Sequence, residues 1–166
     1  MKKILLFAVL FNLFFNIIAQ EAGLDPIKER RFNRGIGITL DDNSPVFAVT
    51  MSRIENLSND ILNKRNFGKY VEMIFNYHEN GKVIEVHMVY SNLKSINVEI
   101  NDIVLSGNVI GYSGGNGTQI NQNNDLYIYI YTTEDCQNLR QLTNSSFIID
   151  EGVYWWNPMF LYSQRD

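Results

Sequence analysis

The chain has 166 residues, of which 45% are hydrophobic and 19% are charged. This composition is that of a globular protein, excludes a disordered one, and suits a single domain with a substantial core. The net charge is −4, and no basic cluster exists beyond residues 28–34, which argues against a nucleic acid partner. Cys136 is the only cysteine, so an internal disulfide is excluded and a structural thiol is expected.

The N-terminus has the features of a secretory signal peptide. Lys2 and Lys3 precede an apolar run over residues 4–19, which falls short of the ~20 apolar residues of a membrane-spanning helix. We therefore predict a signal peptide over residues 1–19 and a lead-in segment over residues 20–31. The protein would then be secreted or reside in the periplasm or cell envelope, without a transmembrane segment in the mature chain. A retained N-terminal anchor is the alternative.

From residue 32 the chain consists of short β-branched and aromatic runs separated by Asp, Asn and Gly. Such runs are typical of strands bounded by turns, and they cover residues 35–40, 45–51, 70–77, 83–90, 96–100, 109–112, 126–131 and 147–149. Asn80-Gly81 between two of them predicts a β-hairpin. Helical spacing predicts two short helices, over residues 56–66 and 134–142. The pattern favours an all-β domain built on an antiparallel sheet, with at most short helices.

The run over residues 126–131 alternates strictly. Because side chains on a strand alternate between faces, we expect one face to be directed to the core (Leu126, Ile128, Ile130) and the other to carry tyrosines (Tyr127, Tyr129, Tyr131). The tyrosine row has two interpretations: ordinary packing on the sheet, or an aromatic floor for a glycan or peptide.

The two histidines offer a weak alternative for metal binding. His78 lies in the predicted hairpin turn and His87 on the following strand, so we expect the first to be solvated and the second packed. Together they would supply two ligands, and no third ligand is evident. Residues 41–44 predict a turn before Pro45 rather than a calcium loop. Residues 113–117 lack the Lys-Ser/Thr that follows a phosphate loop.

The glycine-rich stretch VLSGNVIGYSGGNG over residues 104–117, followed by the strand from residue 125, resembles the C-terminal core of the lysostaphin-like (LytM-type) zinc endopeptidases, which cut peptidoglycan. Four more segments are similar to family motifs in the same order: residues 32–38 to His-x-Gly-x-Asp, 44–49 to Thr-Pro-Val-Tyr-Ala, 90–93 to Tyr-x-His-Leu, and 156–161 to the closing Asn-Pro segment. The resemblance implies a peptidase-like domain over residues 32–162. Its sheet would curl into a split-barrel-like core.

The departures from the family pattern fall on the working positions. The resemblance places the zinc ligands at Asn33, Gly37 and Tyr127, and the histidines that act on water and the oxyanion at Asn92 and Asp125. Gly37 has no side chain, and Asn33 carries a neutral amide. Tyr127 carries a phenol with an ordinary pKa of ~10, and zinc prefers imidazole, thiolate or carboxylate. We therefore expect no catalytic or metal site and no zinc cofactor, and the five positions would form a vestigial groove.

The function implied is that of a pseudoenzyme: a secreted or periplasmic, non-catalytic LytM-type domain that binds cell-wall peptidoglycan or a cell-wall hydrolase partner. Family members with eroded zinc sites are known as activators of cell-wall amidases, which the resemblance extends to this chain as an expectation. Two alternatives stay open. One is an active metalloendopeptidase with unorthodox ligands acting on peptidoglycan, and the other is a purely structural envelope protein.

Overall fold

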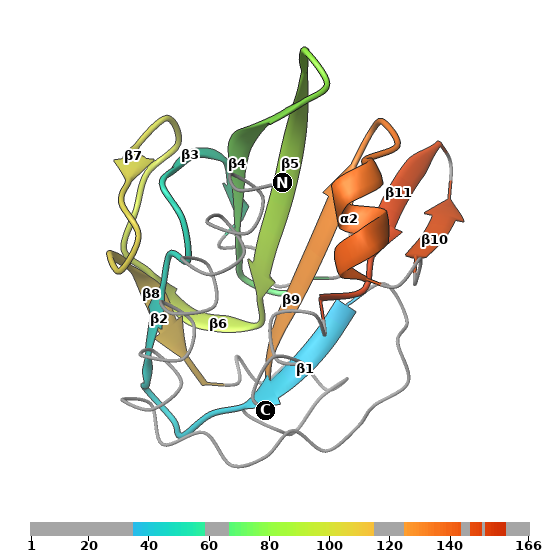
Figure 1. The fold of residues 1–166 in the computed structure, drawn as a ribbon. Coiled ribbons are helices and arrows are strands. Elements are labelled where there is room, and N and C mark those ends of the chain that lie inside the picture. Colours follow the sequence, from blue (N-terminus) through green and yellow to red (C-terminus); the bar gives the residue numbers. More distant parts are fainter. Residues whose placement is uncertain (1–34, 59–66, 115–124, 144–146, 151, 159–166) are drawn as a thin grey trace.

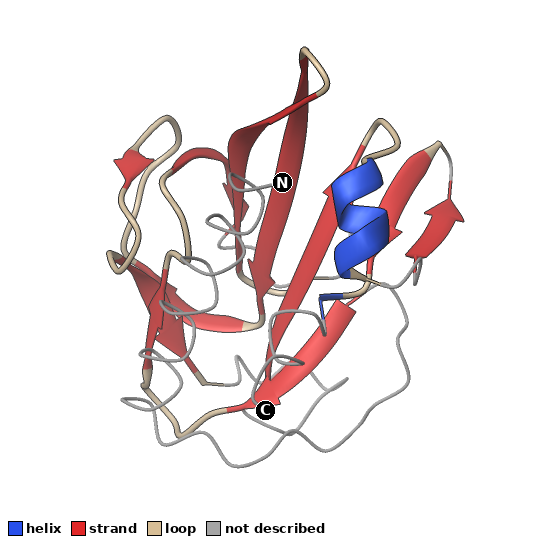
Figure 2. Ribbon diagram, in the orientation of Figure 1, coloured by secondary structure: helices blue, strands red, loops and turns tan. Residues whose placement is uncertain are grey.

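A computed structural model describes residues 35–58, 67–114, 125–143, 147–150 and 152–158. Its elements in chain order are β1 (Gly35–Thr39), β2 (Pro45–Phe47), β3 (Ser52–Ser58), β4 (Tyr70–Glu79), β5 (Lys82–Ser91), β6 (Leu93–Ile96), β7 (Ile103–Val104), β8 (Val109–Ser113), β9 (Asp125–Thr132), α2 (Gln137–Leu142), β10 (Phe147–Asp150) and β11 (Val153–Trp156). The prediction of an all-β domain with short helices is confirmed (Figure 2). No helix in the described part of the chain is long and apolar enough to cross a membrane.

The strands form two antiparallel sheets (Figure 1). The larger has the order β10-β11-β9-β5-β4-β3-β7, and β1 also pairs with β9. The smaller has the order β2-β8-β6. On the side of β9 away from β5, β11 pairs with residues 130–132 and β1 with residues 125–129. Strand β9 therefore pairs with β1, β5 and β11 and fixes their positions relative to one another.

The main core lies on one face of the large sheet, against the small sheet and α2. The predicted alternation of β9 is confirmed, because Leu126, Ile128 and Ile130 are buried in this core. Trp156 is fully buried there, and its indole Nε1 donates a hydrogen bond to Thr132 Oγ1 at 2.9 Å. We call the opposite face, which carries the tyrosines of β9, the second face.

The long hairpin of β4 and β5 forms at the predicted turn. Asn80 and Gly81 both have positive φ, 50° and 77°, and they connect the paired residues Glu79 and Lys82. A type I′ hairpin turn needs this conformation at both central positions, which Asn and Gly adopt at low cost. The hairpin prediction is confirmed.

The predicted helix over residues 56–66 is wrong where the structure describes it. Residues 56–58 are the end of β3, and residues 59–66 lie outside the described part of the chain. The register of β3 shifts between Ile54 and Asn56, and such a bulge breaks the period-two alternation by which a strand is recognised. Two other predictions need correction: the strand predicted over 45–51 ends at Phe47, and the one predicted over 96–100 lies at Leu93–Ile96.

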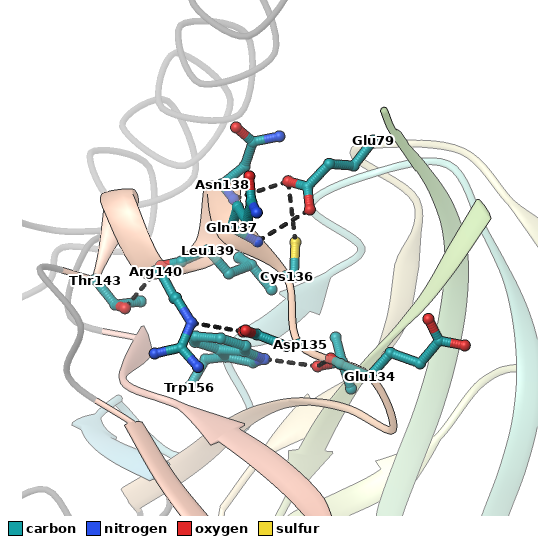
Figure 3. A network of polar contacts seen from close by, with 11 residues as sticks. Glu79, Glu134, Asp135, Cys136, Gln137, Asn138, Leu139, Arg140, Thr143 and Trp156 are labelled. Atoms are coloured by element: carbon teal, nitrogen blue, oxygen red, sulfur yellow. Dashed lines mark hydrogen bonds and ion pairs between the residues drawn. The ribbon is translucent and has the colours of Figure 1, made fainter. Parts of the chain in front are cut away.

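The short helix α2 is capped by a side chain from the β4–β5 hairpin (Figure 3). The backbone N–H groups of Gln137 and Asn138 donate to the Glu79 carboxylate at 3.0 and 2.8 Å. The capping position itself, Cys136, makes no side-chain cap. Its thiol is buried, and burial raises the pKa of Cys136 to about 11, as expected of a structural thiol.

Candidate functional site

Three of the five predicted positions converge at one end of the large sheet. Gly37 on β1 is paired with Tyr127 on β9, and Tyr127 is paired with Ser91 on its other side. Asn92 directly follows Ser91 at the end of β5. Two family positions and the neighbour of a third therefore form one row across β1, β9 and β5.

The two other predicted positions are Asp125 and Asn33. Asp125 is the first residue of β9, and its backbone is paired with Thr39. Asn33 lies outside the described residues.

The ring of Tyr127 lies against the backbone of Gly37. A Cβ atom built on Gly37 would be 3.0 Å from Tyr127 Cε1, which is closer than ordinary carbon contacts of about 3.5–4.0 Å. Two residues earlier, a Cβ on Gly35 would be 2.5 Å from Tyr129 Cδ1 and 2.8 Å from the carbonyl oxygen of Ile128. The two glycines of β1 thus leave the space that the two tyrosine rings of β9 occupy.

These residues do not fit a zinc ion. Position 37 offers no ligand atom, and the space that a side chain there would need is taken by the Tyr127 ring. The neutral amide of Asn92 is a poor zinc ligand. No group of three His, Cys, Asp or Glu side chains that could hold a metal occurs in the described part of the chain.

Asn92 is buried and adopts a left-handed backbone conformation, with φ of 63°. Its backbone N–H donates to the carbonyl oxygen of Phe67 at 3.0 Å. Asparagine is among the few non-glycine residues that tolerate this conformation. The turn after β5 therefore holds a buried amide side chain next to the segment that precedes β4, at a position where the resemblance predicts a histidine.

The second face carries an aromatic cluster that extends from the row of predicted positions. The ring centroid of Tyr129 lies 4.8 Å from that of Phe67 and 6.3 Å from that of Trp155, and Tyr131 lies 4.9 Å from Trp155. Burial raises the pKa of Tyr129, although a hydrogen bond with Ser91 acts in the opposite direction. The sequence alone predicted neither that Phe67 belongs to this cluster nor that Trp155 and Trp156 lie on different faces of the sheet. Alternation along β11 assigns these two tryptophans to opposite faces.

A buried carboxylate lies beside this cluster. Glu72 on β4 is 3% exposed and accepts hydrogen bonds from the Tyr131 hydroxyl and from His87, whose Nδ1 is 3.0 Å away. His87 also stacks on Tyr131, with ring centroids 4.3 Å apart. Two donors compensate the desolvation of the carboxylate. Sequence reasoning missed Glu72, whose only signal is an acid inside an otherwise apolar strand.

His78 and His87 do not form a common site. They are paired with Val83 and Ile74, four register positions apart on the β4–β5 ladder. Four residues of strand span about 13 Å, which is too far for two ligands of one metal ion. His78 is exposed and His87 is packed, as predicted for each.

The two antiparallel sheets and the pairing of β1 and β5 with β9 define an antiparallel all-β domain. The sequence profile described as Peptidase family M23 matches residues 31–139, more than half of the chain. The chain belongs to this family, and the predicted family assignment is confirmed. A search of curated proteins finds no match.

Solved structures with the same fold include several peptidases. A putative peptidase M23 from Pseudomonas aeruginosa has a TM-score of 0.53 and 15% identity, with 84% of this chain and 48% of that chain covered. The catalytic domain of the antimicrobial peptidase lysostaphin from Staphylococcus simulans has a TM-score of 0.49 and 19% identity, with 68% and 79% covered. In the solution structure of lysostaphin, the TM-score is 0.48 and the identity 20%, with 63% of this chain covered. This chain spans only 38% of that lysostaphin chain.

Proposed function

We propose that this chain is a secreted or periplasmic, non-catalytic M23 domain that binds cell-wall peptidoglycan or a hydrolase acting on it. The observation that carries this proposal is the packing of the Tyr127 ring against Gly37. An M23 peptidase needs a ligand at both positions. Here one has no side chain, and the other fills the space with a phenol ring.

The same end of the sheet has the chemistry of a binding surface. Tyr127, Tyr129 and Trp155 are only partly buried on the second face. Aromatic rings offer large rigid contact areas for ligands. Sugars and short peptides both suit such a surface, and peptidoglycan contains both.

The domain boundaries follow from the same proposal. A signal peptide over residues 1–19 and a lead-in over residues 20–31 would deliver a domain over residues 32–162 to the cell wall. The family match begins at residue 31, next to the proposed start of that domain. Residues 1–34 lie outside the described part of the chain.

Co-sedimentation with purified sacculi tests the binding function, with zinc analysis of the same preparation. We expect no stoichiometric zinc in protein purified without chelator. We expect Tyr127→Ala to weaken sacculus binding about five-fold, the energy of one aromatic contact. Tyr112→Ala is the matched control, because Tyr112 is a partly buried tyrosine on the small sheet.

Each outcome separates the alternatives. One zinc per chain that is lost in Asp125→Ala would indicate an active metallopeptidase instead. Equal sacculus binding by Tyr127→Ala and Tyr112→Ala would show that Tyr127 is not part of the binding site. If sacculi are not bound, stimulation of a purified cell-wall amidase by the wild type but not by Tyr127→Ala would identify the hydrolase as the partner. Failure of both assays would leave a structural envelope protein.

A further inference from the structure

A hollow of about 410 Å³ lies at the β3–β4–β5 side of the large sheet, away from the row at Gly37 and Tyr127. Strands β3, β4 and β5 run side by side there (Figure 1). The volume falls within the range of small-ligand pockets, which is about 300–1,000 Å³. On β5, Glu85 at the hollow and Ser91 at the row are six residues apart, about 20 Å along the strand. The hollow is therefore a separate site.

The hollow combines an apolar floor with exposed apolar walls. Ile74 on β4 is 6% exposed, whereas Met51 and Ile103 are each 64% exposed. Ile103 belongs to β7, the end strand of the large sheet, and is paired with Arg53 on β3. Two large apolar side chains that lose little area on folding can still lose it on binding a partner, which favours association.

The polar groups of the hollow carry one unpaired negative charge. The guanidinium of Arg53 is paired with Glu55, with Nη1 and Oε2 2.6 Å apart. Asn76 and Glu85 are cross-strand partners on β4 and β5, and neither side chain makes an ion pair or hydrogen bond in the described part of the chain. An amide and a free carboxylate thus lie beside the apolar walls.

We propose that this hollow binds a cationic peptide segment of a partner protein. One apolar side chain of the segment lies between Met51 and Ile103, and an adjacent Lys or Arg pairs with Glu85. The amide of Asn76 then bonds to the segment's main chain. The occupant is a peptide rather than an anionic membrane, because the free charge at the hollow is negative and the chain carries a net charge of −4, both of which repel anionic lipid.

The experiment is an NMR titration of the ¹⁵N-labelled full chain with two probes, acetyl-Lys-Leu-Lys-amide and acetyl-Glu-Leu-Glu-amide. We expect the cationic peptide to shift amide signals of β3, β4 and β5 around the hollow, with no shift at Tyr127. The anionic peptide should bind at least three-fold more weakly, because one charge reverses from attraction to repulsion. Equal binding of both probes, or shifts confined to the Tyr127 row, would overturn the proposal.

Variants assign the binding to named residues. Glu85→Gln should weaken the cationic peptide two- to five-fold, the usual range for a partly exposed ion pair. Ile103→Ser should weaken it about five- to ten-fold, since the apolar wall is lost and no charge is added. Glu134→Gln is the matched control: this exposed acid precedes α2, outside the hollow. It should leave the affinity unchanged.

Three further measurements test the proposal. Met51→Ser provides a second wall variant if Ile103→Ser does not fold, and it should also weaken the binding of the cationic peptide. Co-sedimentation with phosphatidylglycerol vesicles should show no binding of the wild type. Vesicle binding that Ile103→Ser abolishes would overturn the proposal and indicate a membrane surface. Tyr127→Ala should leave the peptide affinity unchanged, which separates this site from the proposed cell-wall function.

Discussion

The packing of the tyrosine rings against the glycines of β1 predicts that the two strands are energetically coupled through these pairs. In Gly37→Ala the new Cβ would lie 3.0 Å from Tyr127 Cε1, so the ring must move by about 0.5 Å to reach ordinary contact. Overpacking of this kind costs about 1–3 kcal/mol. Loss of glycine entropy in the unfolded chain offsets about 0.4–1 kcal/mol of that cost. We expect net destabilisation of about 0.5–2 kcal/mol.

Tyr127→Ala should relieve the contact. Urea unfolding followed by tryptophan fluorescence gives the free energy of unfolding for the wild type, each single variant and the double variant. We expect the double variant to be less destabilised than the sum of the singles by about 1 kcal/mol, within the range seen for residues in contact. Gly35→Ala is the control. Its new Cβ meets Tyr129 and the Ile128 carbonyl, so it should be more destabilising, and Tyr127→Ala should not rescue it.

Strict additivity of Gly37→Ala and Tyr127→Ala would refute the reasoning. A rise in stability on Gly37→Ala would also refute it, because the new Cβ would then fit beside the Tyr127 ring without overpacking. Rescue of Gly35→Ala by Tyr127→Ala would also refute it, because Tyr127 would then contact Gly35 rather than Gly37.

Three further predictions concern other parts of the chain. Burial raises the pKa of Cys136 from 9.0 to about 11, so the stability contributed by the neutral thiol is complete below pH 9 and is lost as the pH rises through 11. Urea unfolding at pH 8–11 should show this loss in the wild type and a smaller one in Cys136→Ala. Glu79→Gln should destabilise the protein by about 1 kcal/mol, because a charged cap becomes neutral; Glu134→Gln, compared by thermal unfolding, should have no effect, and an equal loss would contradict the capping role. Mass spectrometry of the exported protein should find an N-terminus within two residues of Gln20, whereas a chain that still begins at Met1 would indicate a retained anchor.

The fold could be predicted where local pattern and pairing agree. The alternation of β9 identified its core side, and Asn80-Gly81 identified the hairpin. Strand β3 was missed because its register shift hides the period of two that a strand normally shows. Pattern reasoning assumes unbroken alternation, so bulged strands are the elements it loses.

The candidate site could be predicted as positions but not as contacts. The predicted positions Gly37, Tyr127 and Asn92 lie at one end of the sheet, and their role as a site stays a prediction. The contact of Tyr127 with Gly37 depends on the register between β1 and β9, which no local pattern contains. The same holds for Glu72 and His87, which meet through the pairing of β4 with β5.

The glycine–tyrosine packing also constrains the order in which zinc ligands could be introduced at positions 37 and 127. Gly37→Asp alone would push a carboxylate against the Tyr127 ring, and we expect it to destabilise the protein by more than the about 0.5–2 kcal/mol of Gly37→Ala, because a larger and charged group meets the same ring. Tyr127→His as the first step would remove the phenol and open the space before the acid arrives. Of the two mutational paths, only the one that changes position 127 first passes through a well-packed intermediate.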